Sequence, residues 1–426
     1  MSEIIKPKIL APAGDFVSLN AAIKAGCDEV YFGISGFNMR ANAKNFSIKD
    51  LKKIVHICHK NNVKALLALN TIIYENELLS VKKILLSAKN SGIDAIIAWD
   101  MSVVDLCIDL GIKVHLSTQV SISNYNSLKF YAKKIPNLER VVLARECSLE
   151  DINQIIKKLK KDNLNIEIET FIHGAMCVSI SGRCFMSHEI FGKSANRGEC
   201  LQPCRRKFDV KLIDPEENHE LHLGQDFIMS PKDLCTLDFI EKILETKIHA
   251  LKIEGRNKGP EYVFTVVNSY RRVVDFYFNN YSKFNSKNNN IKNQIINEFF
   301  ELKKVLKKDL EKVYNRGFST GFYLGKPINE WTKEYGNSAT HKKEYVGRVT
   351  NFFKKVSVAE ILVESYPISD MDELQFQGPT TGIIKSNAKI FIDDKPTMSA
   401  KKGDVIHVKV EGVVRKNDQV YRITKR

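Results

Sequence analysis

The segment Lys8-Ile-Leu-Ala-Pro-Ala-Gly14 is a short apolar run, and seven similar runs recur along the first 256 residues. They occupy residues 28–33, 63–70, 94–100, 113–118, 140–145, 166–173 and 250–256. Amphipathic helical patterns, such as those at 47–61, 77–91 and 149–160, separate the runs. Near-continuous apolar strands are typical of parallel sheets, because both faces of such sheets are buried. Eight strands with intervening helices predict an α/β fold, a (β/α)8 TIM-like barrel.

An open, doubly wound sheet is the alternative architecture for such an alternation. Its dinucleotide-binding form carries a Gly-x-Gly-x-x-Gly fingerprint after the first strand. No such pattern follows residues 8–14. The barrel is therefore the favoured prediction.

The chain divides into three predicted parts. Residues 1–278 form the barrel, in which the crossover between strands seven and eight is a long Cys-rich insertion at 174–249. Residues 279–340 form a linker and helical connector. From residue 341 to 426 the apolar pattern has period two in short strands, which predicts a small antiparallel β-barrel.

The insertion holds five of the nine cysteines: Cys177, Cys184, Cys200, Cys204 and Cys235. Their spacings of 7, 16, 4 and 31 residues do not form the paired knuckles of a structural zinc site. Four thiolates on distant loops suit an iron–sulfur cluster, which requires no single spacing. Zinc or reduced structural thiols remain the alternatives. One thiol is spare, and Cys200 and Cys204 compete for one ligand position.

Reactive groups of TIM-type barrels lie at the carboxyl ends of the strands. Polar residues end nearly every predicted strand here; they include Asn70, Gln119, Arg145, Glu169, His173, Glu254 and Arg256. Any one of them could equally be a loop cap or a surface residue. The recurrence at strand after strand favours a functional set.

The chain carries a net charge of +15, which favours a polyanionic partner such as RNA. A lysine-rich composition is the alternative explanation. The first residues do not resemble a signal peptide, and no apolar run is long enough to cross a membrane. A cytoplasmic protein without a membrane partner is expected. A paralogue or a second copy of the chain remains open as a partner.

Several motifs resemble the U32 collagenase-like peptidase family. They are Leu10-Ala-Pro-Ala-Gly14, the run from Glu169 through Cys184, Asn196-Arg-Gly-x-Cys200-x-Gln-Pro-Cys204-Arg and Lys252-Ile-Glu-Gly-Arg256. The chain most resembles the branch whose members hydroxylate C5 of the tRNA wobble uridine, with prephenate as hydroxyl donor. The resemblance implies a tRNA-modifying hydroxylase. Sister branches act on ribosomal RNA or in ubiquinone synthesis, and a hydroxylase of another RNA or of a small molecule stays open.

The resemblance also implies roles for individual residues. A [4Fe–4S] cluster would be held by Cys177, Cys184, Cys200 and Cys235, with Cys204 as the alternative ligand. A dicarboxylate such as prephenate requires cations, for which Arg145, Arg183, Arg197 and Arg256 are the candidates. Asn70 and Gln119 are expected to contact substrate. Glu169, His173 and Glu254 are expected to be catalytic, the first two by moving a proton.

A metal-dependent peptidase is the main competing function, and the family name suggests it. A zinc peptidase of the commonest type would show His-Glu-x-x-His, which the sequence does not contain. A non-catalytic assembly factor or RNA-binding module is the third class, because fold alone does not fix activity.

Overall fold

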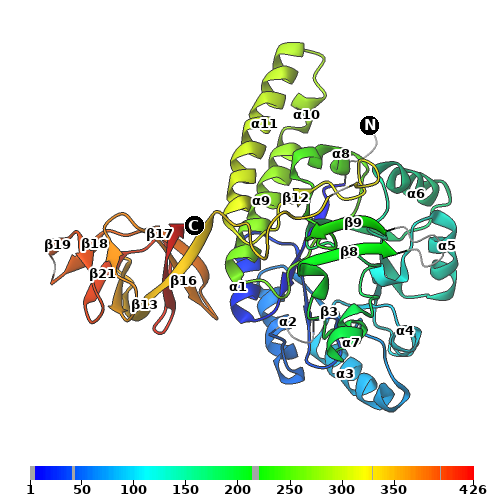
Figure 1. Cartoon of the computed structure of the whole chain (residues 1–426), viewed down its shortest axis with the longest axis horizontal. Helices are drawn as coiled ribbons and strands as arrows, with labels where there is room; N and C mark the ends of the chain where they lie inside the picture. The colour runs from blue at the N-terminus through cyan, green and yellow to red at the C-terminus, as the bar shows by residue number, and fades with distance from the viewer. Residues whose placement is uncertain (1–4, 41–43, 214–219, 329, 394) are drawn as a thin grey trace.

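The computed structural model describes residues 5–40, 44–213, 220–328, 330–393 and 395–426. Eight parallel strands form a closed barrel, because the strand order β11-β1-β2-β3-β4-β5-β6-β7 is completed by pairing of β11 with β7 (Figure 1). The strands are β1 Lys8–Ala13, β2 Glu29–Gly33, β3 Lys64–Ala68, β4 Ala95–Ala98, β5 Val114–Leu116, β6 Leu138–Val142, β7 Glu167–Gly174 and β11 Ala250–Ile253. Each overlaps one of the eight apolar runs, so the predicted barrel is confirmed.

Helices cover the outside of the barrel and are bounded by caps that the sequence carries. Asp15, Asp100, Asn124 and Ser148 each accept a backbone N–H at a helix start, which satisfies one of the free donors of the first turn. The helices are α1 Phe16–Lys24, α2 Leu51–Lys60, α3 Leu78–Ser91, α4 Met101–Asp109, α5 Tyr125–Lys134, α6 Leu149–Lys161, α8 Ile240–Glu245 and α9 Pro260–Asn279.

The insertion between β7 and α8 crosses the carboxyl end of the barrel. It contains α7 Met186–Phe191, the hairpin of β8 Phe208–Ile213 and β9 Glu220–Asp226, and β10 Asp233–Cys235. Strand β10 pairs antiparallel with the end of β7 and parallel with β12 Phe318–Ser319. The insertion is therefore attached to the barrel wall at one side and extends over the barrel opening.

The connector after the barrel is more helical than the sequence suggested. Helix α10 Tyr281–Phe284 is followed by α11 Asn289–Lys312, which begins inside a stretch expected to be a surface linker. The buried residues Ile295, Phe299, Leu306 and Leu310 lie four or seven residues apart and form one helix face. That face packs on α9, and Phe299 stacks on Phe276 at a ring distance of 5.6 Å.

The C-terminal region is an antiparallel sheet of eight strands with its own hydrophobic core. The strand order is β17-β16-β22-β13-β14-β21-β18-β19. These strands are β13 His341–Phe353, β14 Val358–Val363, β16 Glu373–Gly378, β17 Gly382–Asn387, β18 Ile390–Ile392, β19 Lys395–Thr397, β21 Val405–Lys409 and β22 Gln419–Lys425, with β15 Ile368–Ser369 and β20 Ser399–Ala400 paired separately. The short antiparallel strands predicted from the period-two pattern therefore form.

This C-terminal sheet packs against the outside of the barrel at α1 (Figure 1). Asn20 donates from its side chain to the Pro379 carbonyl at 2.7 Å. Gly382 has a φ of +62° and lies so near the helix that an added Cβ would be 2.9 Å from the Ala21 nitrogen. A side chain at position 382 would therefore push the two parts of the molecule apart.

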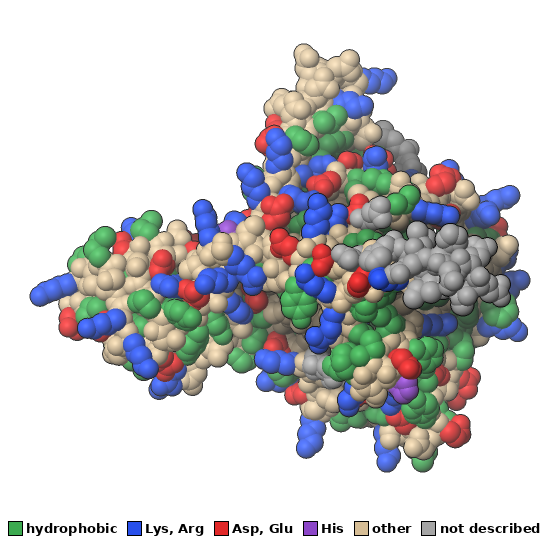
Figure 2. All heavy atoms as spheres, in the orientation of Figure 1, with side chains coloured by type: hydrophobic (Ala, Val, Ile, Leu, Met, Phe, Trp, Pro, Cys, Tyr) green, Lys and Arg blue, Asp and Glu red, His purple; other side chains and the backbone are tan. Residues whose placement is uncertain are grey.

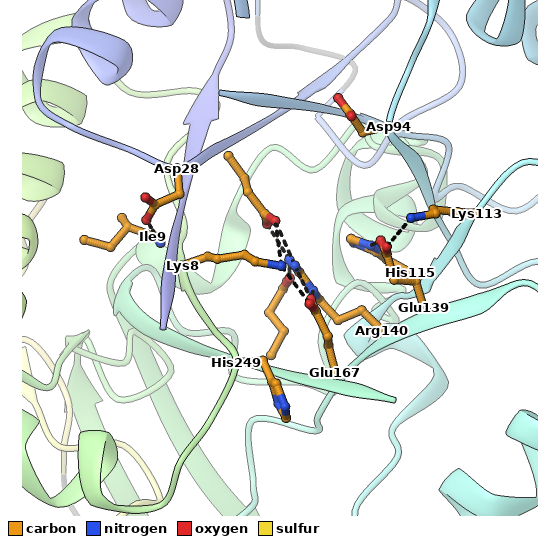
Figure 3. Close-up of polar contacts among 12 residues, drawn as sticks. Lys8, Ile9, Asp28, Asp94, Lys113, His115, Glu139, Arg140, Glu167 and His249 are labelled. Atoms are coloured by element: carbon orange, nitrogen blue, oxygen red, sulfur yellow. Dashed lines mark hydrogen bonds and ion pairs between the residues drawn. The ribbon is translucent and has the colours of Figure 1, made fainter. Parts of the chain in front are cut away.

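The amino end of the barrel is closed by a buried network of charges (Figure 3). The fully buried Arg140 guanidinium donates to Glu29 at 2.5 and 2.8 Å, to Glu167 at 2.5 and 2.8 Å and to Glu169 at 3.1 Å. Lys8 also contacts Glu167, at 2.6 Å. Charged groups without water need such complete pairing, so the network fixes the register of β1, β2, β6 and β7.

No helix in the described part of the chain is both long and apolar enough to cross a membrane.

Candidate functional site

A cavity of about 220 Å³ opens at the carboxyl end of the barrel, below the insertion. Its walls come from the loops that follow β2, β3, β5, β6 and β11 and from the Cys-rich segment after β7. The location is the one at which TIM-type barrels hold their active sites. Among the described residues, five cations line this cavity, namely Arg40, Arg145, Arg205, Lys252 and Arg256, together with one carboxylate, that of Glu254.

Arg256 is the least neutralised of these cations. It is only 6% exposed, its Nη1 has no hydrogen-bond partner, and no ion pair reaches it from the described residues. Burial lowers the pKa of Arg256 to about 10, so the group remains charged at neutral pH. A buried guanidinium without an anion is costly, which indicates that an anionic ligand completes the site.

Arg145 has a similar position on the β6 side of the cavity. Its Nη1 donates to the Ala175 carbonyl at 2.6 Å, and its guanidinium lies 3.8 Å from the centre of the Phe171 ring. The Nε atom is buried without a partner. Arg145 and Arg256 therefore each hold a buried donor atom that has no partner.

Glu254 is the only expected catalytic carboxylate that reaches the cavity. Arg40 binds it through Nη2 at 2.7 Å and Nε at 3.2 Å. Burial raises the pKa of Glu254, but Arg40, Arg145 and Arg256 outweigh burial and hold the pKa at about 2. The carboxylate is thus ionised at neutral pH and orients Arg40.

Lys252 enters the cavity floor from β11 and connects it with the buried charge network. Its Nζ donates to Glu169 at 2.8 Å, and it lies 4.7 Å from the Tyr31 ring centre and 5.4 Å from that of Phe171. Burial raises the pKa of Glu169, but Lys252 and Arg140 hold it at about 2. Glu169 itself does not line the cavity and is held by Lys252 and Arg140.

The expected substrate contacts Asn70 and Gln119 lie together in the cavity wall. Asn70 Nδ2 donates to Gln119 Oε1 at 2.9 Å, and Gln119 Nε2 donates to the Asn70 carbonyl at 3.1 Å. Trp99 Nε1 donates to the same carbonyl at 3.0 Å. These hydrogen bonds fix the orientation of both side-chain amides in the cavity wall.

Four of the five clustered thiols line the cavity: Cys177, Cys184, Cys200 and Cys204. All four are free thiols. Burial raises the pKa of Cys204, which Arg205 counteracts, and the other three thiols are near enough to raise it further. No three His, Cys, Asp or Glu side chains of the described residues converge closely enough to hold a single metal ion.

Cys235 differs from the expectation. It lies in β10, is 2% exposed, and packs 3.9 Å from the Tyr270 hydroxyl within the hydrophobic core. It does not line the cavity that the other four thiols share. Cys204 therefore shares the cavity wall with Cys177, Cys184 and Cys200, and Cys235 does not.

His173 also lies outside the cavity. It is 2% exposed among the rings of Tyr262, Tyr270 and Phe318, with Nδ1 3.4 Å from the Tyr270 hydroxyl. Burial lowers the pKa of His173 to about 4, so it is neutral in this core. A direct catalytic role is therefore not assigned to it.

Arg183 and Arg197 were expected to bind a dicarboxylate, but they lie at the rim. Arg197 pairs with Glu77 at 2.5 and 2.8 Å, which neutralises it. Arg183 donates to the Gln119 carbonyl at 2.8 Å and lies over the Trp99 ring. Both belong to the insertion and hold it on the barrel.

Sequence reasoning missed three of the five cavity cations: Arg40, Arg205 and Lys252. Lys252 could have been found, because residues 252, 254 and 256 lie two apart and share a side of an extended segment. Arg205 directly follows Cys204. Arg40 lies on a loop after β2, and no pattern in the sequence marks it.

Comparison with known proteins gives the family. The model for peptidase family U32 matches residues 14–333. The chain belongs to peptidase family U32. A collagenase of Porphyromonas gingivalis is 40% identical over 427 residues, which are 98% of each chain.

Several relatives are named for RNA hydroxylation. The tRNA hydroxylation protein P1 of Bacillus subtilis is 38% identical over 276 residues, 64% of each chain. The 23S rRNA 5-hydroxycytidine C2501 synthase of Escherichia coli is 34% identical over 268 residues, 63% of this chain and 39% of the relative. The chain is thus similar both to a relative named a collagenase and to relatives named for RNA hydroxylation.

Proposed function

We propose that this protein is a cytoplasmic RNA-modifying enzyme that hydroxylates C5 of the wobble uridine of tRNA to give 5-hydroxyuridine. Prephenate, a dicarboxylate, is the proposed hydroxyl donor. The observation that carries the proposal is a barrel cavity with five cations, one carboxylate and an unpaired buried guanidinium. The names of the relatives from Bacillus subtilis and Escherichia coli support RNA as the substrate class.

The two least neutralised arginines suit a dicarboxylate. Arg256 and Arg145 have buried donor atoms without partners, and a guanidinium grips a carboxylate through two parallel hydrogen bonds. Lys252, held by Glu169, adds a third positive group at the cavity floor. These side chains would bind and orient the donor, while Asn70 and Gln119 offer fixed amides to a base.

The thiol set fits an iron–sulfur cluster better than a single zinc ion. A single ion requires several donors in contact with one atom, an arrangement that the described residues lack. In a cluster each thiolate binds a different iron, so more widely spaced thiols suffice. Cys177, Cys184, Cys200 and Cys204 would hold a [4Fe–4S] cluster beside the cavity. When bound, such a cluster supplies one-electron redox chemistry.

The proposed function has a direct test in cellular RNA. A strain without the gene is expected to lose 5-hydroxyuridine and its derivatives from tRNA, as measured by mass spectrometry of digested nucleosides. Expression of the wild-type protein should restore them. Unchanged tRNA nucleosides together with a missing hydroxycytidine in ribosomal RNA would redirect the assignment to another RNA. No change in either RNA would overturn it.

The thiol assignment predicts a difference between cysteine variants. Protein purified without oxygen is expected to lose its iron and sulfide in the Cys184→Ala and Cys204→Ala variants, because a cluster needs four thiolates. The Cys235→Ala variant should retain both, as should the control Cys58→Ala in α2. Iron and sulfide analysis checks this. Loss in Cys235→Ala with retention in Cys204→Ala would restore the ligand set expected from family resemblance.

A peptidase is the second candidate, because the Porphyromonas gingivalis relative is named a collagenase. Residues Gly317-Phe-Ser-Thr-Gly321 fit the Gly-x-Ser-x-Gly pattern of serine hydrolases. Ser319, however, lies in β12 and its hydroxyl accepts a bond from the Gly321 nitrogen, and no helix follows as in a nucleophile elbow. Hydrolysis of gelatin by the purified protein, lost on mutation of a cavity residue, would favour this candidate.

A further inference from the structure

We infer that the rim of the cavity is a stacking surface for unpaired RNA bases, made of exposed apolar side chains of the insertion and of insertion arginines that lie over aromatic rings. The inference rests on the proposed function for its choice of RNA. It adds a second contact region outside the cavity and names the residues that form it.

The apolar part of this surface, the rim patch, consists of Val178, Ile180, Phe185, Ile190, Phe191 and Leu201. Phe185 is 75% exposed, Ile190 52% and Leu201 45%. Figure 2 shows hydrophobic side chains gathered over α7. So many large apolar groups within 24 residues of a loop are unusual for a surface that faces only water, and they indicate a binding surface.

The rim patch is continuous with the cavity. Val178 lines the cavity together with the adjacent Cys177. Leu201 follows Cys200, another lining residue, and its nitrogen donates to the buried Ser187 of α7 at 3.0 Å. A chain bound on the patch could therefore extend one base into the cavity.

Arginine–aromatic pairs flank the rim patch. Three arginines of the insertion each lie over a ring: Arg206 over Phe191 at 6.0 Å, Arg183 over Trp99 at 4.8 Å and Arg197 over Tyr74 at 4.9 Å. Guanidinium planes and aromatic rings are the surfaces on which proteins stack splayed bases.

The positive charge of the segment around the rim patch favours RNA as the partner. Residues 174–210 contain six Lys and Arg against three Asp and Glu, within a chain of net charge +15. A phosphate backbone beside stacked bases complements this combination of cations and rings. A fully paired duplex keeps its bases stacked inside the helix, so the surface fits a single-stranded loop.

The test compares two RNAs and two pairs of variants. Phe185→Ala with Phe191→Ala removes the exposed rings of the rim patch. Phe130→Ala with Phe300→Ala removes two other exposed rings, on α5 and α11, and serves as the control. The probes are a fluorescently labelled RNA hairpin with an unpaired loop and a blunt RNA duplex of the same composition.

The rim variant is expected to bind the hairpin roughly 10-fold more weakly or worse, because each stacked base contributes substantially to affinity. Its duplex affinity, its melting temperature and its affinity for prephenate should equal those of wild type. The control variant should match wild type with both RNAs. Unchanged hairpin affinity would overturn the inference, as would a rim variant whose only defect is loss of self-association by light scattering.

The result is independent of the nucleoside analysis. Normal hairpin binding by the rim variant, together with loss of 5-hydroxyuridine in the deletion strain, would remove the stacking surface and leave the proposed function. Weakened hairpin binding with unchanged cellular nucleosides would leave an RNA-binding surface on a protein of different activity.

Discussion

The Arg256→Ala variant is expected to bind prephenate roughly 100-fold more weakly than wild type, measured by isothermal calorimetry. Removing one partner of a buried, hydrogen-bonded charge pair costs about 2–5 kcal/mol, and a factor of ten corresponds to about 1.4 kcal/mol. The same variant should keep or slightly raise the melting temperature. The reason is that Arg256 is buried without an anionic partner, so its removal relieves an uncompensated charge.

Two further variants serve as comparisons for the Arg256→Ala result. Arg256→Lys keeps the charge but loses the planar pair of donors, and an intermediate affinity is expected. Arg197→Ala removes an arginine of the insertion that is already paired with Glu77, and its prephenate affinity should equal that of wild type. A strongly destabilised Arg256→Ala protein with intact prephenate binding would show that Arg256 is structural.

The Arg140→Ala variant is expected to lose about 3–5 kcal/mol of unfolding free energy, measured by denaturant titration. Arg140 is fully buried and compensates the carboxylates of Glu29, Glu167 and Glu169. Breaking a buried ion pair from one side leaves charge without solvation, which is the source of this loss. The exposed pair of Arg348 and Glu364 offers a control, because Arg348→Ala should cost about 0–1 kcal/mol.

Low pH should weaken the same network by protonating its carboxylates. The pKa of Glu169 is lowered from 4.5 to about 2, so its stabilising contribution is complete above pH 4.5 and is lost as pH falls towards 2. Stability measured over this range should fall less steeply in the Glu169→Gln variant, which has no group to protonate. Parallel curves for the two proteins would contradict the assignment.

The fold was predictable because buried parallel strands leave a signal that is local in sequence. The runs at 28–33 and 166–173 became β2 and β7 with ends within one or two residues. Ser148 marked the start of α6 through its capping box. The start of helix α11 was not predictable, because its first turns are rich in Asn and Lys and its apolar stripe is narrow.

The site was predictable in its position but not in its membership. Asn70, Gln119, Arg145, Glu254 and Arg256 do line one cavity, because strand ends in a barrel converge. The site residues of the insertion were harder to predict, because its loops show no hydrophobic periodicity. Nothing local distinguishes Cys204, which lines the cavity, from Cys235, which lies in a core strand, and nothing local reveals that Glu77 neutralises Arg197.

One side chain joins the two ends of the barrel. Lys252 reaches into the cavity, yet the carboxylate that holds it, Glu169, also belongs to the charge network around Arg140. Mutations that loosen the barrel base should therefore impair ligand recognition before they unfold the protein. Substitutions in the charge network at the amino end of the barrel and in the cavity at its carboxyl end would then be coupled in evolution. A defect in the network would first be detected as weaker ligand binding.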